Sequence, residues 1–230
     1  MNAPGVVDAA PDRRIVIAID GPAGAGKSTV GRALADRLSV GYLDTGAMYR
    51  AMTFAALRRG VVEGDLDEVA EMAPEVEMSI EDGVVTVDGV DATAAIRGRE
   101  VTEAVSQVAA NPVVRSVLVA QQREWVRERG GGVVEGRDIG SVVFPDADLK
   151  LFVTASPRVR AERRVREIGG DVDDVERSII LRDRYDSSRD HSPLTETDNA
   201  VTVDTTGMAI AEVVDHILDL LAAARHELPS

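Results

Sequence analysis

Apolar residues gather in five short runs that predict buried β-strands. The runs lie at 14–20, 41–44, 132–136, 149–155 and 200–205, and the first of them, RIVIAID, is rich in β-branched residues, which favour strands. Between the runs, apolar positions recur at helical spacing, as Val30, Leu34 and Leu38 do after the first run. Buried strands that alternate with helices predict an α/β fold, with three α/β/α layers built on a five-stranded parallel sheet.

One segment departs from this alternation and predicts a different local structure. Residues 76–96 alternate apolar with polar positions, and the pairs Asp82-Gly83 and Asp88-Gly89 interrupt the apolar positions. Aspartate–glycine pairs are typical of the tight turns in antiparallel hairpins. We therefore expect a small antiparallel insert on the α/β core.

These patterns together predict one domain with short tails. A chain of 230 residues can bury one sizeable core and a smaller subdomain. We expect the domain at 15–226, with flexible tails at 1–14 and 227–230. Its expected parts are a core at 15–62 and 112–226, the antiparallel insert at about 63–111, and an arginine-rich lid at about 156–172.

The composition narrows the classes of function. The chain has no cysteine, which excludes disulfides and thiolate metal sites and fits a reducing, cytoplasmic setting. Its formal net charge of −14 disfavours binding to nucleic acid and to anionic membranes. No apolar run approaches the ~18 residues of a membrane span. The chain also lacks a coiled-coil repeat, so we expect a monomer.

The turn after the first predicted strand carries the clearest chemical signal. It reads DGPAGAGKST at 20–29 and holds one of only two lysines among the 26 basic residues. Residues 21–28 fit the pattern G-x4-G-K-[ST], with the preceding strand and following helix that this pattern requires. Small residues leave backbone N–H groups free to surround a phosphate, and the positive end of the next helix points there too. The turn therefore predicts a nucleoside triphosphate site.

Two side chains of this turn have expected roles of their own. Lys27 would reach the β- and γ-phosphates as a compact point charge. The Ser28 hydroxyl would ligate Mg²⁺, with the remaining ligands largely phosphate and water. The expected ATP-binding residues are Gly21, Pro22, Ala23, Gly24, Ala25, Gly26, Lys27, Ser28 and Thr29.

Two further segments are candidates for the second anion site that a phosphotransferase needs. DTGAMYR at 44–50 and GRDIG at 136–140 each follow a predicted strand, where an open α/β sheet binds its ligands. Both contain arginine, whose planar fork suits phosphate oxygens. We expect Thr45 to cap the next helix, whose first turns hold Arg50.

Arginines are dense in the C-terminal half of the chain. Those of the predicted lid are Arg158, Arg160, Arg163, Arg164 and Arg166. The segment fits either a solvated helix whose arginines pair with nearby acids such as Glu162 and Glu167, or a mobile lid over the triphosphate. Further along, Arg182, Asp186 and Arg189 are spaced to share one helix face.

With these motifs assembled, the chain resembles the bacterial cytidylate kinases, a branch of the nucleoside monophosphate kinases. The matching stretches are IDGPAGAGKST, YLDTGAMYR, SQVAANPVVR, EGRDIGSVVFPDA and RDRYDSSR, which run in that family's order from Ile19 to Arg189. The glycine turn is shared by many phosphate-binding proteins, whereas the other stretches together are specific to this family. The resemblance implies transfer of the γ-phosphoryl group of ATP to CMP or dCMP, with Mg²⁺ as cofactor.

The resemblance also implies roles for individual residues. The catalytic residues would be Lys27, Arg137, Arg158 and Arg189. The acceptor nucleotide would lie near Thr45, Tyr49, Arg50, Ser106, Arg115, Arg137, Asp138, Arg182 and Asp186. Position 135 holds glutamate where some relatives have aspartate, a departure that bears on the magnesium contacts.

Two other interpretations stay open from the sequence. Another small-acceptor kinase, such as an adenylate or shikimate kinase, would share the scaffold and differ in its acceptor. A nucleotide-dependent switch or adaptor would bind the triphosphate and need no acceptor. A guanine-reading switch is disfavoured, because none of the three asparagines precedes a lysine as the N-K-x-D stretch requires.

Overall fold

A computed structural model of the chain describes residues 15–61, 66–81, 83–188 and 199–227, together with Leu194, Glu196 and Thr197. The predicted tail at 1–14 lies outside the described residues, as do the last three residues of the predicted C-terminal tail. Arg189, an expected catalytic residue, also lies outside them. Within the described ranges, no helix combines the length and the apolar character that crossing a membrane requires.

The predicted parallel sheet is confirmed. Its five strands are β1 (Val16–Asp20), β2 (Tyr42–Asp44), β6 (Gly132–Gly136), β7 (Leu149–Thr154) and β8 (Val201–Asp204). They lie in the order β2-β6-β1-β7-β8, and every neighbouring pair is parallel. Each strand falls inside its predicted apolar run. All five carboxyl ends therefore meet at one edge of the sheet, and the loops that leave this edge carry the candidate site.

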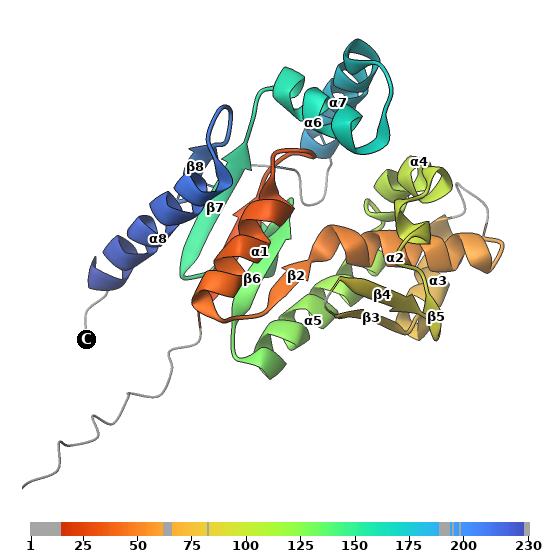
Figure 1. The fold of residues 1–230 in the computed structure, drawn as a ribbon. Coiled ribbons are helices and arrows are strands. Elements are labelled where there is room, and N and C mark those ends of the chain that lie inside the picture. The colour runs from red at the N-terminus through yellow and green to blue at the C-terminus, as the bar shows by residue number, and fades with distance from the viewer. Residues whose placement is uncertain are drawn as a thin grey trace, which may run out of the picture.

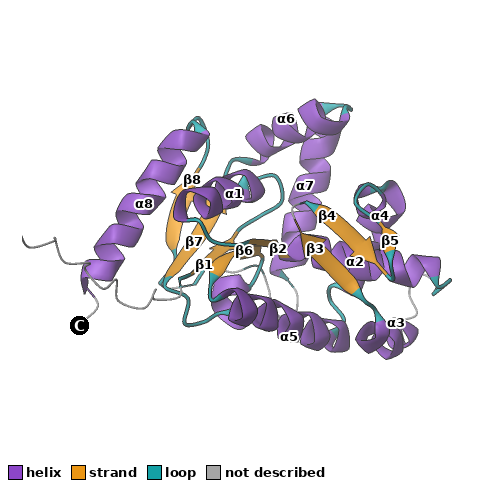
Figure 2. Cartoon of the chain, turned by 60° about the horizontal axis from the view of Figure 1, so that its bottom comes forward, coloured by secondary structure: helices purple, strands orange, loops and turns teal. Residues whose placement is uncertain are grey.

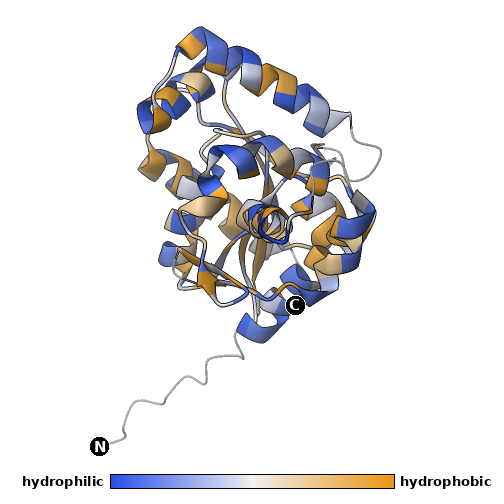
Figure 3. Cartoon of the chain, turned by 90° about the vertical axis from the view of Figure 1, so that its right-hand side faces the viewer, coloured by the Kyte–Doolittle hydropathy of each residue, from blue (hydrophilic) through white to orange (hydrophobic). Residues whose placement is uncertain are grey.

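Helices cover both faces of this sheet, as the three-layer prediction requires (Figure 1). On one face, α1 (Lys27–Leu38) and α8 (Ile210–Glu227) bury apolar side chains such as Leu34 and Ile217 against the strands. On the other face, α2 (Thr45–Arg58) and α5 (Pro112–Arg129) bury Met52 and Leu118. The helices around the sheet carry both hydrophilic and hydrophobic residues (Figure 3).

The antiparallel insert is also confirmed, and it lies beside α2 (Figure 2). It consists of α3 (Leu66–Met72), η1 (Ala73–Glu75), β3 (Met78–Glu81), β4 (Val84–Val87), β5 (Val90–Asp91), η2 (Ala95–Arg97) and α4 (Arg99–Val108). The three strands pair in the order β3-β4-β5, antiparallel throughout. Val85 and Val87 of β4 join the same apolar cluster as α2, so the insert is held by the core and is not a separate unit.

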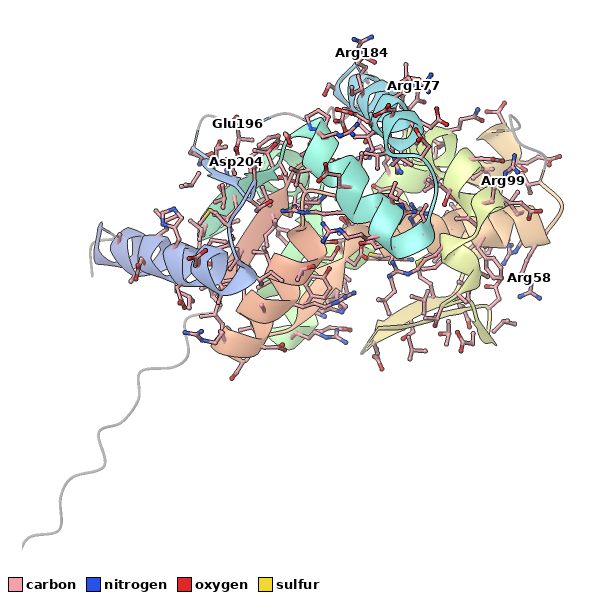
Figure 4. All side chains as sticks on the ribbon, turned by 45° about the horizontal axis from the view of Figure 1, so that its top comes forward. Arg58, Arg99, Arg177, Arg184, Glu196 and Asp204 are labelled. Atoms are coloured by element: carbon pink, nitrogen blue, oxygen red, sulfur yellow. The ribbon has the colours of Figure 1, made fainter. Side chains whose placement is uncertain are left out.

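A pair of helices extends beyond the carboxyl edge of the sheet (Figure 1). α6 (Pro157–Ile168) and α7 (Val172–Ser187) are joined by Gly169 and Gly170, both of which have positive φ. Ser156 caps α6 by accepting from the Val159 N–H, and Asp171 caps α7 by accepting from two backbone N–H groups. Arg177 and Arg184 project from the outer side of α7 (Figure 4). The predicted lid at 156–172 corresponds to α6 and this turn, and its boundaries remain a prediction.

Candidate active site

The glycine turn lies between β1 and α1, as predicted, and its geometry requires glycine. Gly21, Gly24 and Gly26 all have positive φ. A Cβ on Gly21 would lie 2.0 Å from the Val153 carbonyl oxygen, so no side chain fits at this position. The Lys27 ammonium donates to the Pro22 carbonyl at 2.9 Å, which folds the side chain back over the loop. The loop is thus a backbone cradle with the buried Lys27 ammonium folded against it.

Burial shapes the charge of this cradle. Burial, and then the nearby Arg137 guanidinium, lower the pKa of Lys27 below its usual range. A negative ligand between the two cations would oppose both effects, because it favours the charged form of each. The site is therefore preorganised for an anion.

Ser28, the expected magnesium ligand, lies against the Glu135 carboxylate. Its hydroxyl donates to Glu135 Oε1 at 2.6 Å. Glu135, at the end of β6, is paired in register with Asp44 at the end of β2. Burial, and then the Asp44 charge, raise the pKa of Glu135. These acids were not among the expected site residues, although two acids at the carboxyl ends of predicted parallel strands were a usable signal.

On the acceptor side, one expectation was wrong. Thr45 does not cap α2; Asp44 does, because its carboxylate accepts from the Ala47 N–H at 3.0 Å. Thr45 is the first residue of the helix, and its buried hydroxyl donates to the Glu135 carbonyl at 2.7 Å. The bond ties α2 to β6, so that Tyr49 and Arg50 are presented one turn further on.

Arg50 lies in a cluster of cations. Its guanidinium donates to the Ile96 carbonyl and to the Thr102 hydroxyl at 3.2 and 3.0 Å, which orients it from the side of α4. Burial, followed by the charges of Arg182 and Arg164, lowers its pKa to about 10. Ser106 is half-buried on α4, one turn after Thr102. An acceptor phosphate placed among these arginines would relieve their mutual repulsion.

Arg115 and Asp138 form a buried ion pair. The Arg115 guanidinium also donates to the Ala109 carbonyl at 3.2 Å, and it lies 5.6 Å from the centre of the Tyr49 ring. The three side chains come from α2, α5 and the loop after β6. Together they form a surface made of the Tyr49 ring, the N–H donors of Arg115 and the Asp138 carboxylate, which we call the acceptor wall.

Arg137 joins the two halves of the site. Its Nη1 donates to the Gly21 carbonyl of the glycine turn at 2.8 Å. Its Nε donates to the Asp186 carboxylate on α7 at 3.0 Å, and this carboxylate is almost fully buried. Arg182 lies one turn before Asp186 on the same helix. Arg137 thus lies between the triphosphate turn, the acceptor-side residues and α7.

The arginines of α6 divide into two groups. Arg158 pairs with Asp173 and Glu176 of α7 and with Glu162 of its own helix, and Arg164 pairs with Glu167. This is the pattern expected of a solvated helix. Arg160 and Arg163 instead face the glycine turn: the Arg160 Nη1 donates to the Ala23 carbonyl at 3.2 Å, and the Arg163 Nη1 lies near Gly26. The sequence places these arginines in one segment, but it does not show which of them face the glycine turn.

Bonds on either side hold Arg160 and Arg163 in place. Arg160 also donates to the Ala155 carbonyl and to Asp183, at 2.9 and 2.7 Å. Arg163 donates to the Thr205 hydroxyl at 3.1 Å, and this hydroxyl in turn donates to the Ala25 carbonyl at 2.9 Å. The two arginines therefore link α6 and the end of β8 to the glycine turn.

Sequence comparisons show which known proteins this chain resembles. Residues 17–223 match the family described as cytidylate kinase. The chain is 49% identical over 212 residues to a cytidylate kinase of Mycobacterium leprae, covering 90% of this chain and 95% of that protein. It is 46% identical over 217 residues to a cytidylate kinase of Streptomyces griseus, covering 92% and 94%.

A longer relative and two solved structures add context. The chain is 47% identical over 218 residues to a bifunctional pantoate ligase/cytidylate kinase of Trichodesmium erythraeum, and it spans 41% of that protein's length. A gluconokinase from Sinorhizobium meliloti has a similar fold, with a TM-score of 0.50, 17% identity, and 92% and 93% of the two chains covered. An uncharacterized protein from Eubacterium ventriosum has a TM-score of 0.53, 13% identity, and 91% and 99% covered. These two structures support the fold alone, whereas the family match and the identities show that the chain belongs to the cytidylate kinase family.

Proposed function

We propose that this cytidylate kinase transfers the γ-phosphoryl group of ATP to CMP or dCMP, giving ADP and CDP or dCDP, between the two halves of the site described above. The observation that carries the assignment of residues is the position of Arg137. It contacts the triphosphate turn at Gly21, and it precedes Asp138, which pairs with Arg115 in the acceptor wall. A phosphoryl group in transit between two such pockets would pass this guanidinium.

The donor pocket would bind the triphosphate through backbone N–H groups of residues 21–29. Lys27 would leave the Pro22 carbonyl and reach the β- and γ-phosphates, where its charge offsets the charge that develops during transfer. Arg160 and Arg163 close the loop from the side of α6, so they would limit access of water to the phosphates.

The residues around Ser28 fit a magnesium ion. Mg²⁺ prefers oxygen ligands and keeps several waters. This site offers the Ser28 hydroxyl bonded to the Glu135 carboxylate, with Asp44 opposite Glu135 on the neighbouring strand. The Glu135 carboxylate accepts from Ser28 through Oε1, and the Tyr42 hydroxyl interacts with the same carboxylate. Ser28 would hold the ion, with Glu135 and Asp44 orienting its waters. When bound, Mg²⁺ would neutralise charge on the transferring phosphates.

The acceptor pocket would read cytosine by its edge. A carboxylate accepts from the exocyclic amino group of cytosine, and a guanidinium donates to ring acceptors. The Asp138–Arg115 pair offers both, and Tyr49 would line the pocket beside them. Uracil has a carbonyl oxygen in place of that amino group, and the Asp138 carboxylate would repel this oxygen. Ser106, Arg182 and Asp186 would face the sugar, with Thr45 at the pocket floor.

Catalysis would rest on positioning and charge, without a general base. Phosphoryl transfer requires in-line placement and neutralisation more than covalent chemistry. Arg50 would hold the acceptor phosphate, and Arg137, Arg158 and Arg189 would contact the phosphates during transfer. Arg158 would first have to leave Asp173 and Glu176 on α7. The same proposal includes a monomeric enzyme, supported by the lack of a coiled-coil repeat.

An acceptor panel tests this function. ADP production would be measured with ATP and Mg²⁺, adding CMP, dCMP, UMP, AMP, dTMP, GMP or shikimate one at a time. We expect strong stimulation by CMP and dCMP. Stimulation by another acceptor alone would overturn the reading of the pocket, and ATP turnover that no acceptor stimulates would indicate a nucleotide-dependent switch instead.

A further inference from the structure

The loop that carries Arg137 and Asp138 continues into an unusual turn. Residues Ile139–Val143 form a single π-helical turn, η3, directly after Asp138. π-helical turns are rare and occur mostly at functional sites, because their widened backbone is less stable than an α-helix. Such a turn needs support from outside, and Asp20 and Arg123, neither of which is among the expected substrate-binding residues, provide it.

Asp20 holds the start of the turn. Its two carboxylate oxygens accept from the Ile139 and Gly140 N–H groups, each at 2.7 Å, and the side chain is buried. A Cβ on Gly140 would lie 3.3 Å from Asp20 Oδ2 and 3.1 Å from Cδ of Lys150, so the contact leaves little room for a side chain there. Asp20 is also the last residue before the glycine turn. The Asp20 carboxylate thus links the glycine turn to the loop that carries Arg137 and Asp138.

Arg123 holds the end of the turn. From α5 its Nε donates to the Val143 carbonyl at 3.0 Å, and its Nη2 donates to the Val142 carbonyl at 2.9 Å. The same helix carries Arg115, the partner of Asp138, about two turns earlier. α5 therefore carries Arg115, the cation of the acceptor wall, and through Arg123 it also holds the turn that follows Asp138.

We propose that Asp20 and Arg123 are positioning residues for the acceptor pocket: together they clamp the turn at 139–143 so that Arg137 and Asp138 face the acceptor nucleotide. The inference rests on the proposed function, since it assumes that this wall binds CMP. Aspartate suits the first position because it offers two acceptors and no donor, matching two backbone N–H groups. Arginine suits the second because its fork reaches two adjacent carbonyls.

Arg123 gives the sharper test, because its side chain is exposed and its removal does not open the core. Arg123→Ala is compared with Arg127→Ala, one turn further on, whose guanidinium pairs with Glu124 of its own helix. We expect Arg123→Ala to raise the Kd for CMP, measured by calorimetry without ATP, by about fivefold to tenfold. The KM for ATP should stay within about twofold, and Arg123→Lys, which keeps a donor, should restore part of the loss.

The outcomes separate the two proposals. If the wild-type protein phosphorylates CMP but Arg123→Ala matches Arg127→Ala in CMP affinity, the clamp is overturned while the function stands. If the wild-type protein does not phosphorylate CMP, the proposed function is wrong, and the clamp, which assumes that this wall binds CMP, is wrong with it. Asp20→Asn provides a second arm: the amide keeps one acceptor and presents a donor to the other N–H, so CMP affinity should fall. The double variant should lose less than the sum of the single losses, because both residues hold one turn.

Discussion

Asp44 and Glu135 lie opposite each other in the register of β2 and β6, and the Ser28 hydroxyl donates to the second of them at 2.6 Å. The two acids stand at the carboxyl ends of neighbouring parallel strands. α2 begins directly after Asp44, and the glycine turn begins at the end of β1, the strand on the other side of β6. The Asp44 charge raises the pKa of Glu135 and the nearby Lys27 charge lowers it, so a second cation placed here would further favour the charged carboxylate. The arrangement therefore suits a magnesium ion that arrives with the nucleotide.

Glu135→Gln should separate this role from folding. Burial raises the pKa of Glu135, so the charged form costs stability as the pH rises through that pKa, and a neutral amide should leave the melting temperature at neutral pH equal or higher. Turnover should fall about 10- to 100-fold, as for other residues that orient metal ligands, and should recover in part with added Mg²⁺. Activity against Mg²⁺ concentration is the measurement. Glu71→Gln on the exposed face of α3 is the control, and equal behaviour of the two variants would remove Glu135 from the site.

Asp138→Asn should lower both the free energy of unfolding and the affinity for CMP. The variant leaves the Arg115 guanidinium buried without its charged partner, which costs about 3 kcal/mol of unfolding free energy. Affinity for CMP should fall by about 100-fold, while the KM for ATP changes little, because a buried charge-assisted contact to the base is lost. Urea unfolding and a titration with CMP measure the two effects. A large loss of ATP affinity with CMP affinity preserved would reverse the assignment of the two pockets.

The affinity for CMP should depend on pH through protonation of the Asp20 carboxyl. Burial raises its pKa to about 6, with the bonds from Gly140 and Ile139 acting in the other direction, and with Asp138 and Lys27 as its charged neighbours. Below that pH the carboxyl becomes protonated and can no longer accept from both N–H groups. We therefore expect affinity for CMP to fall between pH 7 and pH 5.

Folding stability should move in the opposite sense to acceptor affinity. A carboxyl whose folded pKa is raised contributes stability that is present below its unfolded pKa and is lost as the pH rises through about 6. The phosphate of CMP also titrates at about pH 6, and this titration by itself changes the affinity for CMP. Asp20→Asn is therefore the control that separates the phosphate from the Asp20 carboxyl. If the pH profile of CMP affinity is the same in this variant as in the wild type, Asp20 is not the group responsible.

Arg158 and Arg160 should behave differently when truncated. Arg160 is buried and bonds the glycine turn at Ala23, so Arg160→Ala should raise the KM for ATP by about tenfold or more and lower the melting temperature. Arg158 is half exposed, so Arg158→Ala should leave stability almost unchanged. If it acts on the phosphates, its loss should lower kcat about 10- to 100-fold with little change in the KM for either substrate. Arg166→Ala is the matched control on α6; a kcat equal to that of this control would remove Arg158 from the catalytic group.

Much of the fold is determined locally and was therefore predictable. The five strands formed at the five short apolar runs, and the turn at 21–26 formed where glycines allow positive φ. The antiparallel insert followed from its turn residues. Arg115, Arg137 and Asp138 were named in advance from the resemblance to the cytidylate kinases, and the structure brings them together.

The remaining features depend on contacts between distant parts of the chain, which no local pattern encodes. Asp20 meets Ile139 across a separation of 119 residues, and Ser28 meets Glu135 across 107. Both contacts follow from the order and register of the strands. The choice of Arg160 over Arg158 at the glycine turn depends on how α6 is rotated as it packs against α7 and the sheet. A sequence determines which side chains a helix carries, but only packing decides which of them faces the substrate.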